Sequence, residues 1–362
     1  MKLTINTNVI KELVSKAVKG ASNNKLLPIT SLLGIELKDG QLTLTTTDGT
    51  NYLYVRKDKV AGDNFYTVIS VDTFSKLVSK TTSENIVLEL TESSLRVTGN
   101  GTYNIELPMD ENGQMIKYPD PASAFLKKMP SKTYTWNKST VGVILETLAP
   151  ALAITYDNPQ YTGYYVGDAV VATDTYKIAN MDVSLFDDAK LIAAQTMNLL
   201  DAMSDEKISV YVSGDEILFS TGGSVVYSKF MSGLEDYAID AISSLVKEQF
   251  DSKCAISRAE FLRLLDRLSL FVGTYDDNAV TLTFTKSGLQ VSSKSSSGVE
   301  IIPYVSSENF IDFICDVDIE LLTQEIKAIK SDTIELYYGV DTSIKMVDGN
   351  ITIIVALLET EA

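Results

Sequence analysis

The feature that most constrains this chain is a threefold internal repeat. In each third, a helical stretch ends at a Ser-acid pair and is followed by two alternating strands. The first strands align with separations of 122 and 126 residues, and the second strands with separations of 122 and 127. Two independent markers give one period, so the sequence predicts three similar domains. The aligned positions are Ile86, Ile208 and Ile334 in the first strand and Leu95, Ile217 and Ile344 in the second.

Each third also repeats within itself. Residues 2–57 and 66–107 both read as a strand, a helix and three further strands, with helical and then alternating apolar spacing. Asn8, Ser139 and Ser257 are the predicted N-caps of the first helix in each third. Six such units predict an α+β fold in which helices cover one face of half-buried strands. The predicted domains are 1–128, 129–250 and 251–362, with linkers near 118–131 and 241–252.

Composition narrows the classes of function. No apolar run approaches the roughly 18 residues that span a bilayer, and the start lacks the apolar stretch of a signal peptide, so we expect a cytoplasmic protein with no membrane partner. Cys254 and Cys315 fit buried, reduced thiols. The chain has no histidine, which excludes Ser-His-Asp, Cys-His and His-metal sites. No catalytic residue, metal ligand or cofactor site is predicted.

A Thr-Asp pair closes a strand at Asp48 and again at Asp174, 126 residues later. The two carboxylates could be read as paired acids, but an Asp that shapes a turn through its own backbone is the favoured interpretation. The third copy has Ser293 and Lys294 at this place, so the fold does not require the Asp. The Gly-Asn-Gly at 99–101 opens no helix, which excludes a dinucleotide-binding loop.

Six segments carry a resemblance to a known family: "MKLTI" at the start, "LLPITSLLGIEL" at 26–37, "LTLTTTD" at 42–48, "VVATDTYKIA" at 170–179, "LEDY" at 234–237 and "ITIIVALL" at 351–358. Together with the repeat, they resemble the bacterial beta sliding clamp family, the processivity subunit of replicative DNA polymerase III, over the full length. The resemblance implies two chains that close head to tail into a dimeric ring, with helices inside and sheets outside. Double-stranded DNA would pass through the hole without its sequence being read, and the clamp would perform no chemistry.

The family tethers its DNA polymerase and clamp loader through short apolar peptides, which enter a pocket between the second and third domains. This chain departs from the family at that pocket: Thr175-Tyr176-Lys177 replaces Gly-His-Arg, and Glu235 replaces Pro. The departures imply a divergent copy with its own partner set, or one from a mobile element or phage. The resemblance carries over to Tyr161, Thr173, Asp174, Thr175, Tyr176, Lys177, Ile178, Glu235, Ile239, Asp240, Ile353, Ile354, Val355, Ala356, Leu357 and Leu358.

A net charge of −17 argues against a DNA partner unless cations gather on one surface. Basic residues do recur on the helices that would line the hole, although any one of them fits an ordinary solvated face as well. The second domain is poor in them. The predicted DNA-binding residues are Lys11, Lys16, Lys19, Lys25, Lys76, Lys80, Arg258, Arg263, Arg267, Lys327 and Lys330.

For the dimer, an edge strand with Tyr103 and Ile105 is expected to meet a helix end with Leu270 and Phe271 of a second chain. The leading hypothesis is therefore a DNA sliding clamp. The alternative is an interaction scaffold of clamp-like domains that has lost DNA, and an enzyme ranks below both. Retention on circular DNA distinguishes the first two, because a closed ring slides off only when the circle is linearised.

Overall fold

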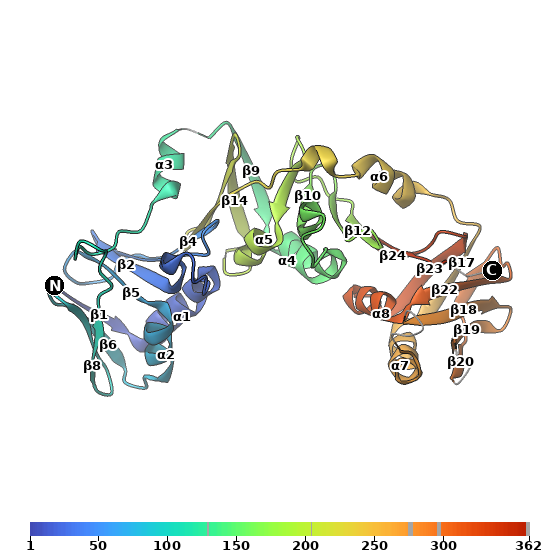
Figure 1. The fold of residues 1–362 in the computed structure, drawn as a ribbon, viewed down its shortest axis with the longest axis horizontal. Coiled ribbons are helices and arrows are strands. Elements are labelled where there is room, and N and C mark those ends of the chain that lie inside the picture. The colour runs from blue at the N-terminus through green and yellow to red at the C-terminus, as the bar shows by residue number, and fades with distance from the viewer. Residues whose placement is uncertain (129, 204, 274–277, 295–297, 360–362) are drawn as a thin grey trace. The chain divides into compact units, whose positions relative to one another are not determined.

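The computed structural model describes residues 1–128, 130–203, 205–273, 278–294 and 298–359 (Figure 1). It contains six repeats of strand, helix and three strands, as predicted. The first two are β1 Lys2–Asn6, α1 Thr7–Ala17, β2 Leu32–Lys38, β3 Gln41–Thr47, β4 Tyr52–Lys57 and β5 Phe65–Ser70, α2 Val71–Lys80, β6 Asn85–Leu90, β7 Ser94–Thr98, β8 Thr102–Glu106. The next two are β9 Lys132–Asn137, α4 Lys138–Thr147, β10 Gly163–Val166, β11 Val170–Thr173, β12 Lys177–Met181 and β13 Lys190–Ala193, α5 Ala194–Leu200, β14 Lys207–Ser213, β15 Glu216–Ser220, β16 Ser224–Lys229.

The last two repeats are β17 Ser252–Ser257, α7 Arg258–Leu268, β18 Ala279–Thr285, β19 Gly288–Ser293, β20 Val299–Ile302 and β22 Phe313–Asp318, α8 Ile319–Ala328, β23 Thr333–Val340, β24 Ser343–Asp348, β25 Ile351–Ala356. A short strand, β21 Ser306–Glu308, lies outside this pattern and pairs with β17. The 3-10 turns are η1 Val18–Gly20, η2 Pro28–Ser31, η3 Ala149–Ala151, η4 Pro159–Thr162, η5 Leu234–Asp236 and η6 Ser269–Phe271.

Successive repeats exchange their first strands. In the first pair, β1 joins β6-β7-β8 while β5 joins β2-β3-β4, and every neighbouring pair is antiparallel. The same exchange places β13 beside β10, β9 beside β14, β22 beside β18 and β17 beside β23. Because each repeat completes the sheet of its neighbour, two repeats are the smallest set in which all of these strands are paired.

Sheets from different pairs then join through their last strands. β4 pairs with β16 to give an eight-stranded sheet, and β12 pairs with β25 to give a nine-stranded sheet. The last strands of the second and fifth repeats, β8 and β20, each have only one partner among the described strands, β7 and β19 respectively. They are therefore free edges within the chain.

The chain forms two compact units. One contains residues 1–141 and 195–230, and the other contains 142–194 and 231–362. Each holds one complete pair of repeats and one four-stranded half of the middle pair. The bounds of the three predicted domains stay a prediction, and the first of them falls beside residue 129, which lies outside the described ranges.

The six aligned marker residues are all fully buried in β6, β14 and β23 or in β7, β15 and β24. Strand register explains this constancy, because a shift of one residue would turn each marker out of its core. The repeat that the sequence predicts is therefore a repeat of core positions.

Two of the three predicted N-caps are wrong. The first helix is capped by Asn6, not Asn8, because the Asn6 backbone is extended and its side chain accepts from the amide of Asn8. Ser139 lies inside α4, which begins at Lys138. Helices also lie at the predicted linkers: α3 Pro121–Lys127 falls within 118–131, and α6 Ile239–Lys247 overlaps 241–252. In α3, proline stands at the first helical position, where it starts a helix instead of breaking one, and Phe125 is fully buried. The Ser257 cap is confirmed.

Candidate functional site

The first Thr-Asp turn is held by its own side chains. The Asp48 carboxylate accepts from the amides of Thr50 and Asn51 at 2.9 and 2.7 Å. The Thr47 hydroxyl donates to the carbonyl of Asn51 and accepts from the amide of Gly49 at 3.0 Å. Gly49 has a φ of 103°, a conformation that glycine adopts without a steric penalty.

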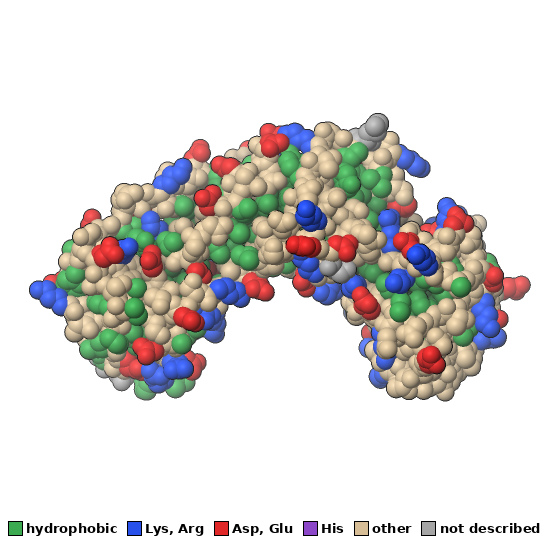
Figure 2. Space-filling model, turned by 180° about the vertical axis from the view of Figure 1, so that it is seen from behind, with side chains coloured by type: hydrophobic (Ala, Val, Ile, Leu, Met, Phe, Trp, Pro, Cys, Tyr) green, Lys and Arg blue, Asp and Glu red, His purple; other side chains and the backbone are tan. Residues whose placement is uncertain are grey.

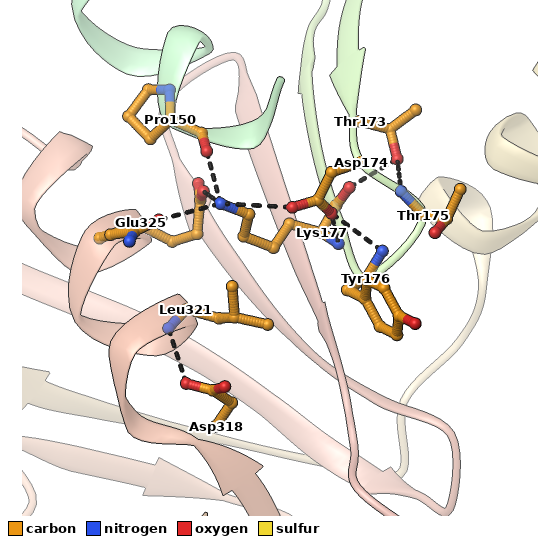
Figure 3. Close-up of polar contacts among 10 residues, drawn as sticks. Pro150, Thr173, Asp174, Thr175, Tyr176, Lys177, Asp318, Leu321 and Glu325 are labelled. Atoms are coloured by element: carbon orange, nitrogen blue, oxygen red, sulfur yellow. Dashed lines mark hydrogen bonds and ion pairs between the residues drawn. The ribbon is translucent and has the colours of Figure 1, made fainter. Parts of the chain in front are cut away.

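The second turn repeats this network bond for bond. Asp174 accepts from the amides of Tyr176 and Lys177 at 2.9 and 2.8 Å, and Thr173 bonds the Lys177 carbonyl and the Thr175 amide (Figure 3). Thr175 stands where the first turn has glycine and has a φ of 83°. Both aspartates therefore shape turns, as the sequence indicated for Asp48.

The fifth residue of the second turn is a buried lysine. Lys177 is 3% exposed, and its ammonium donates to the carbonyl of Pro150 and to Gln324 Oε1 at 3.0 Å. The same nitrogen lies 3.5 Å from Asp174 Oδ2 and 3.6 Å from Glu325 Oε1 (Figure 3). This ammonium thus links the turn before β12 to helix α8 of the sixth repeat.

Glu325 is the residue at this site that the sequence analysis missed. Its side chain is fully buried, and neither carboxylate oxygen accepts a hydrogen bond from the described residues. Burial raises the pKa of Glu325 to about 7, with Lys177 opposing the shift and Asp174 adding to it. One signal was available: Glu325 stands three residues after Leu322 and beside Ile326, on the buried stripe of α8.

The predicted pocket residues fall into two groups, and the first forms an apolar cluster. Tyr161, Ile178 and Ile354 are buried together, and Ile239 packs against them. Thr173 in β11 and Val355 in β25 are also buried, but they are not members of this cluster. The sequence analysis missed the other buried members of the cluster, which alternate along strands or follow the "LED" turn: Tyr165, Val171, Leu191, Tyr237 and Ile242.

Three tyrosines dominate this cluster. The Tyr161 and Tyr237 rings meet edge to face at 5.0 Å, and Tyr165 lies 5.6 Å from Tyr237. Burial raises the pKa of Tyr237 well above its usual range, and its hydroxyl donates to the carbonyl of Val171 at 3.4 Å. The Tyr237 hydroxyl therefore lies inside a packed aromatic and aliphatic cluster.

The second group of predicted pocket residues is more exposed. Tyr176 is 65% exposed at the tip of the turn, Glu235 is exposed, and Leu357 and Leu358 are half-buried. After β25 the chain turns toward the fifth and sixth repeats, where the Leu358 amide donates to the carbonyl of Asp316 at 2.8 Å. Tyr176, Leu357 and Leu358 are not members of the buried cluster.

The predicted DNA-binding cations also divide into two groups. Lys11, Lys25, Lys80, Arg263 and Lys327 have no ion pair within the described ranges. The others have partners of their own: Lys16 with Glu12, Lys19 with Asp201, Lys76 with Asp72, Arg258 with the carbonyls of Ile326 and Lys327, Arg267 with Glu300, and Lys330 with Glu146.

Charge is distributed unevenly between the helix pairs. Helices α1 and α2 carry four lysines and two acids, whereas α7 and α8 carry four basic and four acidic residues. Both pairs are far less acidic than a chain of net charge −17. On the face drawn in Figure 2, basic and acidic side chains are interspersed and form no single continuous patch. A local cationic surface is therefore compatible with the acidic total.

Of the predicted dimer residues, Tyr103 is 47% exposed on β8, and Leu270 and Phe271 are 80% and 51% exposed in η6. Ile105 is buried in the core of its own sheet, so only its backbone lies at the edge. The two cysteines lie buried and unbridged in β17 and β22, as predicted. No helix in the described ranges is long and apolar enough to cross a membrane.

Paired repeats with exchanged first strands, linked edge to edge into long antiparallel sheets, define the DNA-clamp fold. Residues 1–115 match the family model for the N-terminal domain of the DNA polymerase III beta subunit. The beta sliding clamp of Rickettsia felis is 23% identical, over 94% of this chain and 93% of the relative, and that of Staphylococcus epidermidis is 21% identical over 82% and 81%. The Bacillus subtilis sliding clamp superposes with a TM-score of 0.84 at 18% identity, covering all of both chains.

The DNA polymerase III beta subunit of Borrelia burgdorferi likewise covers both chains fully, with a TM-score of 0.85 at 16% identity. The matched N-terminal domain, the near full-length relatives and the shared fold agree with one another. Residues 1–115 carry the match to the family model, and the whole chain has the fold of the solved sliding clamps.

Proposed function

We propose that this protein is a DNA sliding clamp: a non-enzymatic processivity factor that encircles duplex DNA and tethers the replicative polymerase and other DNA-processing proteins. The observation that carries the proposal is the pairing rule of the last strands. The last strand of repeat one pairs with that of repeat four, and the last strand of repeat three pairs with that of repeat six. Repeats two and five are left with the free edges β8 and β20.

The same rule applied between two chains pairs β8 of each with β20 of the other. This closes a two-fold, head-to-tail ring with no strand edge left at these positions. Natural proteins seldom leave edges of this kind uncovered, and β20 carries the exposed apolar residues Val299 and Ile301. Beside it, Leu270 and Phe271 extend the apolar surface that a second chain would bury.

Ring assembly is tested by Phe271→Asp, which places a charge in an apolar contact. We expect sedimentation to show monomers, or a dimer weakened by at least tenfold. The matched control is Ile314→Asp, because Ile314 is 67% exposed on β22, at the opposite edge of the same sheet, and should leave the dimer intact. An unchanged Phe271→Asp dimer would remove this contact from the proposal.

Encirclement is tested by topology. After loading, the clamp should stay on nicked circular DNA in salt and leave when the circle is cut, because a ring is held by the closed template and not by affinity. Equal loss from both templates would favour the alternative, a clamp-fold scaffold that does not encircle DNA. Because replicating DNA is the proposed partner, we expect the protein in the bacterial cytoplasm.

Partner peptides would bind at the apolar cluster around Ile178 and Tyr161, beside the exposed Tyr176. Each buried aliphatic anchor contributes about 1.5–3 kcal/mol, from which the cost of ordering the peptide subtracts, so micromolar affinity is expected. Glu235 and Glu359 replace apolar family residues and are exposed. Peptides with a basic residue beside their anchors should therefore bind several-fold more tightly, and the preference should fade with salt.

The peptide site is tested by calorimetric titration of two peptides that differ only by Lys or Ser beside the anchor. Ile178→Asp should abolish binding of both, while the dimer and DNA retention persist. Undiminished affinity in Ile178→Asp would place the site elsewhere. Equal affinity of the two peptides at low salt would show that the two glutamates do not border it.

A further inference from the structure

Two grooves lie between paired helices, one in each compact unit. The first, about 400 Å³, runs between α1 and α2 and has an apolar floor that includes Val14 and Val78. Its polar walls are Lys11 and Lys76, with hydroxyls from Ser15, Ser75 and Ser79. It contains no acidic side chain. Lysine ammonium groups and serine hydroxyls are the side-chain donors that bind phosphate oxygens.

The second groove, about 300 Å³, runs between α7 and α8 over Leu265 and Ile319. Its polar walls carry the opposite charge: Asp266 and Glu320 face it, and Lys327 is its only basic residue among those described. Two carboxylates beside one ammonium disfavour a phosphate at this place.

The two grooves are equivalent positions of the repeat. The helices can be aligned on their N-caps, Asn6 with Ser257 and Ser70 with Asp318. The alignment places Lys11 opposite Leu262, Ser15 opposite Asp266, Lys76 opposite Gln324 and Ser79 opposite Lys327. The two helix pairs thus have the same N-cap positions, but the side chains lining their grooves differ in charge.

The arginines of α7 do not offset the negative charge of the groove between α7 and α8. Arg258 donates to the carbonyls of Ile326 and Lys327, and Arg267 binds Glu300 through Nε at 2.8 Å and through a second nitrogen. Of the basic side chains in α7 and α8, those of Arg263 and Lys327 have no ion-pair or hydrogen-bond partner among the described residues. In the first groove, Lys11 has no ion pair, and Lys76 holds only an exposed pair with Asp72, which costs little to break.

We infer that each chain grips the phosphates of duplex DNA at one main place, the groove between α1 and α2, and that the equivalent groove between α7 and α8 makes no attractive contact. This rests on the proposed function. In a two-fold ring the duplex would then be held at two opposite places instead of at every helix pair. Contacts this few leave DNA free to slide, because each phosphate contact adds only a modest, salt-sensitive affinity.

The test compares two double charge reversals in the full-length dimer: Lys11→Glu/Lys76→Glu in the first groove and Arg263→Glu/Lys327→Glu at the second. Each replaces two cations on equivalent helices. Affinity for a 30-base-pair duplex is measured by fluorescence anisotropy over a range of salt concentrations. We expect the first pair to weaken binding at low salt at least tenfold and to lower the salt slope by about two, near 0.9 per lost phosphate contact. The second pair should change affinity less than threefold.

An equal or larger effect of the second pair would overturn the inference. A third variant, Asp266→Lys, sharpens it, because a cation at this position should strengthen binding and steepen the salt slope. Sedimentation and circular dichroism of each variant establish that the dimer and the fold persist. Retention of the wild-type protein on nicked circular DNA is measured alongside. Loss of the wild-type protein from this DNA would reject the clamp function. If the wild type is retained but the two double variants weaken DNA binding equally, only the inference of one main phosphate-binding groove is rejected.

Discussion

The two Thr-Asp turns share the hydrogen bonds that their Thr and Asp side chains make to the backbone, and they differ in what lies beneath them. Under the first, Asn51 is buried and neutral: its amide donates to Asp48 at 2.7 Å and accepts from Thr196 Oγ1 at 2.7 Å. Under the second, Lys177 is equally buried but charged, and it meets two carboxylates. The comparison teaches that the turn is one module, whereas its fifth residue is adapted to the neighbouring element.

This difference has an energetic side. The Asn51 side-chain amide is neutral and hydrogen-bonded through both its nitrogen and its oxygen, so the first turn buries no charge there. A substitution at Asn51 would therefore remove only ordinary hydrogen bonds. Lys177 lies against Glu325, whose carboxylate lacks hydrogen bonds within the described structure. A buried ion pair contributes little net stability when intact, but losing one partner is costly. The second turn should therefore be much more sensitive to substitution and to pH.

The largest effect is expected from Lys177→Met, which leaves Glu325 buried without its cation. We expect the unit that contains residues 142–194 and 231–362 to lose about 3–5 kcal/mol, read as a lower urea midpoint. The double variant Lys177→Met/Glu325→Leu removes both charges and should recover most of the loss. A single variant as stable as wild type would show that the pair is not buried as a charge.

Glu325→Gln should abolish a pH dependence that is unusual for an acid. The native pKa of Glu325, about 7, lies above its unfolded value, so the native state holds the proton more tightly. Stability contributed by this group is present below the unfolded pKa and is lost as the pH rises to about 7. The advantage of Glu325→Gln over wild type should grow by about 3 kcal/mol between pH 5 and pH 8. Parallel stability curves for the two proteins across this range would contradict the prediction.

The contrast between the turns also shows what sequence can reveal. Repeat markers such as Ile86 and Ile208 were predictable because core register repeats with the fold. The order of one strand, one helix and three strands within residues 2–57 and 66–107 was predictable because local apolar spacing determines it. Glu325 and Tyr237 were not assigned to the site, because their roles depend on contacts between repeats far apart in the chain. Helix α3 was not predicted because Pro121 is compatible with both a helix break and a helix start.

Gly49→Thr tests whether the first turn tolerates threonine at the position where the second turn has Thr175. Gly49 has a φ of 103°, and a Cβ there would lie 2.9 Å from Leu27 Cδ1. A β-branched residue in this conformation costs about 1–3 kcal/mol, and the half-exposed Leu27 can move aside at small further cost. We expect thermal unfolding of the first unit to shift down accordingly. No shift would mean that the turn relaxes to another φ, which an amide exchange measurement at Asn51 would detect.

Thr175→Gly is the reverse exchange and should have the smallest effect. Relief of the strain at φ 83° stabilises the native turn by about 1 kcal/mol. Glycine also gives the unfolded chain more freedom, which offsets roughly 0.5–1 kcal/mol of that gain. The Thr175 amide still donates to Thr173 Oγ1, so no hydrogen bond is lost. We therefore expect a change of a few tenths of a kcal/mol in the urea midpoint, whereas a loss of more than about 1 kcal/mol would show that the Thr175 side chain makes a stabilising contact of its own.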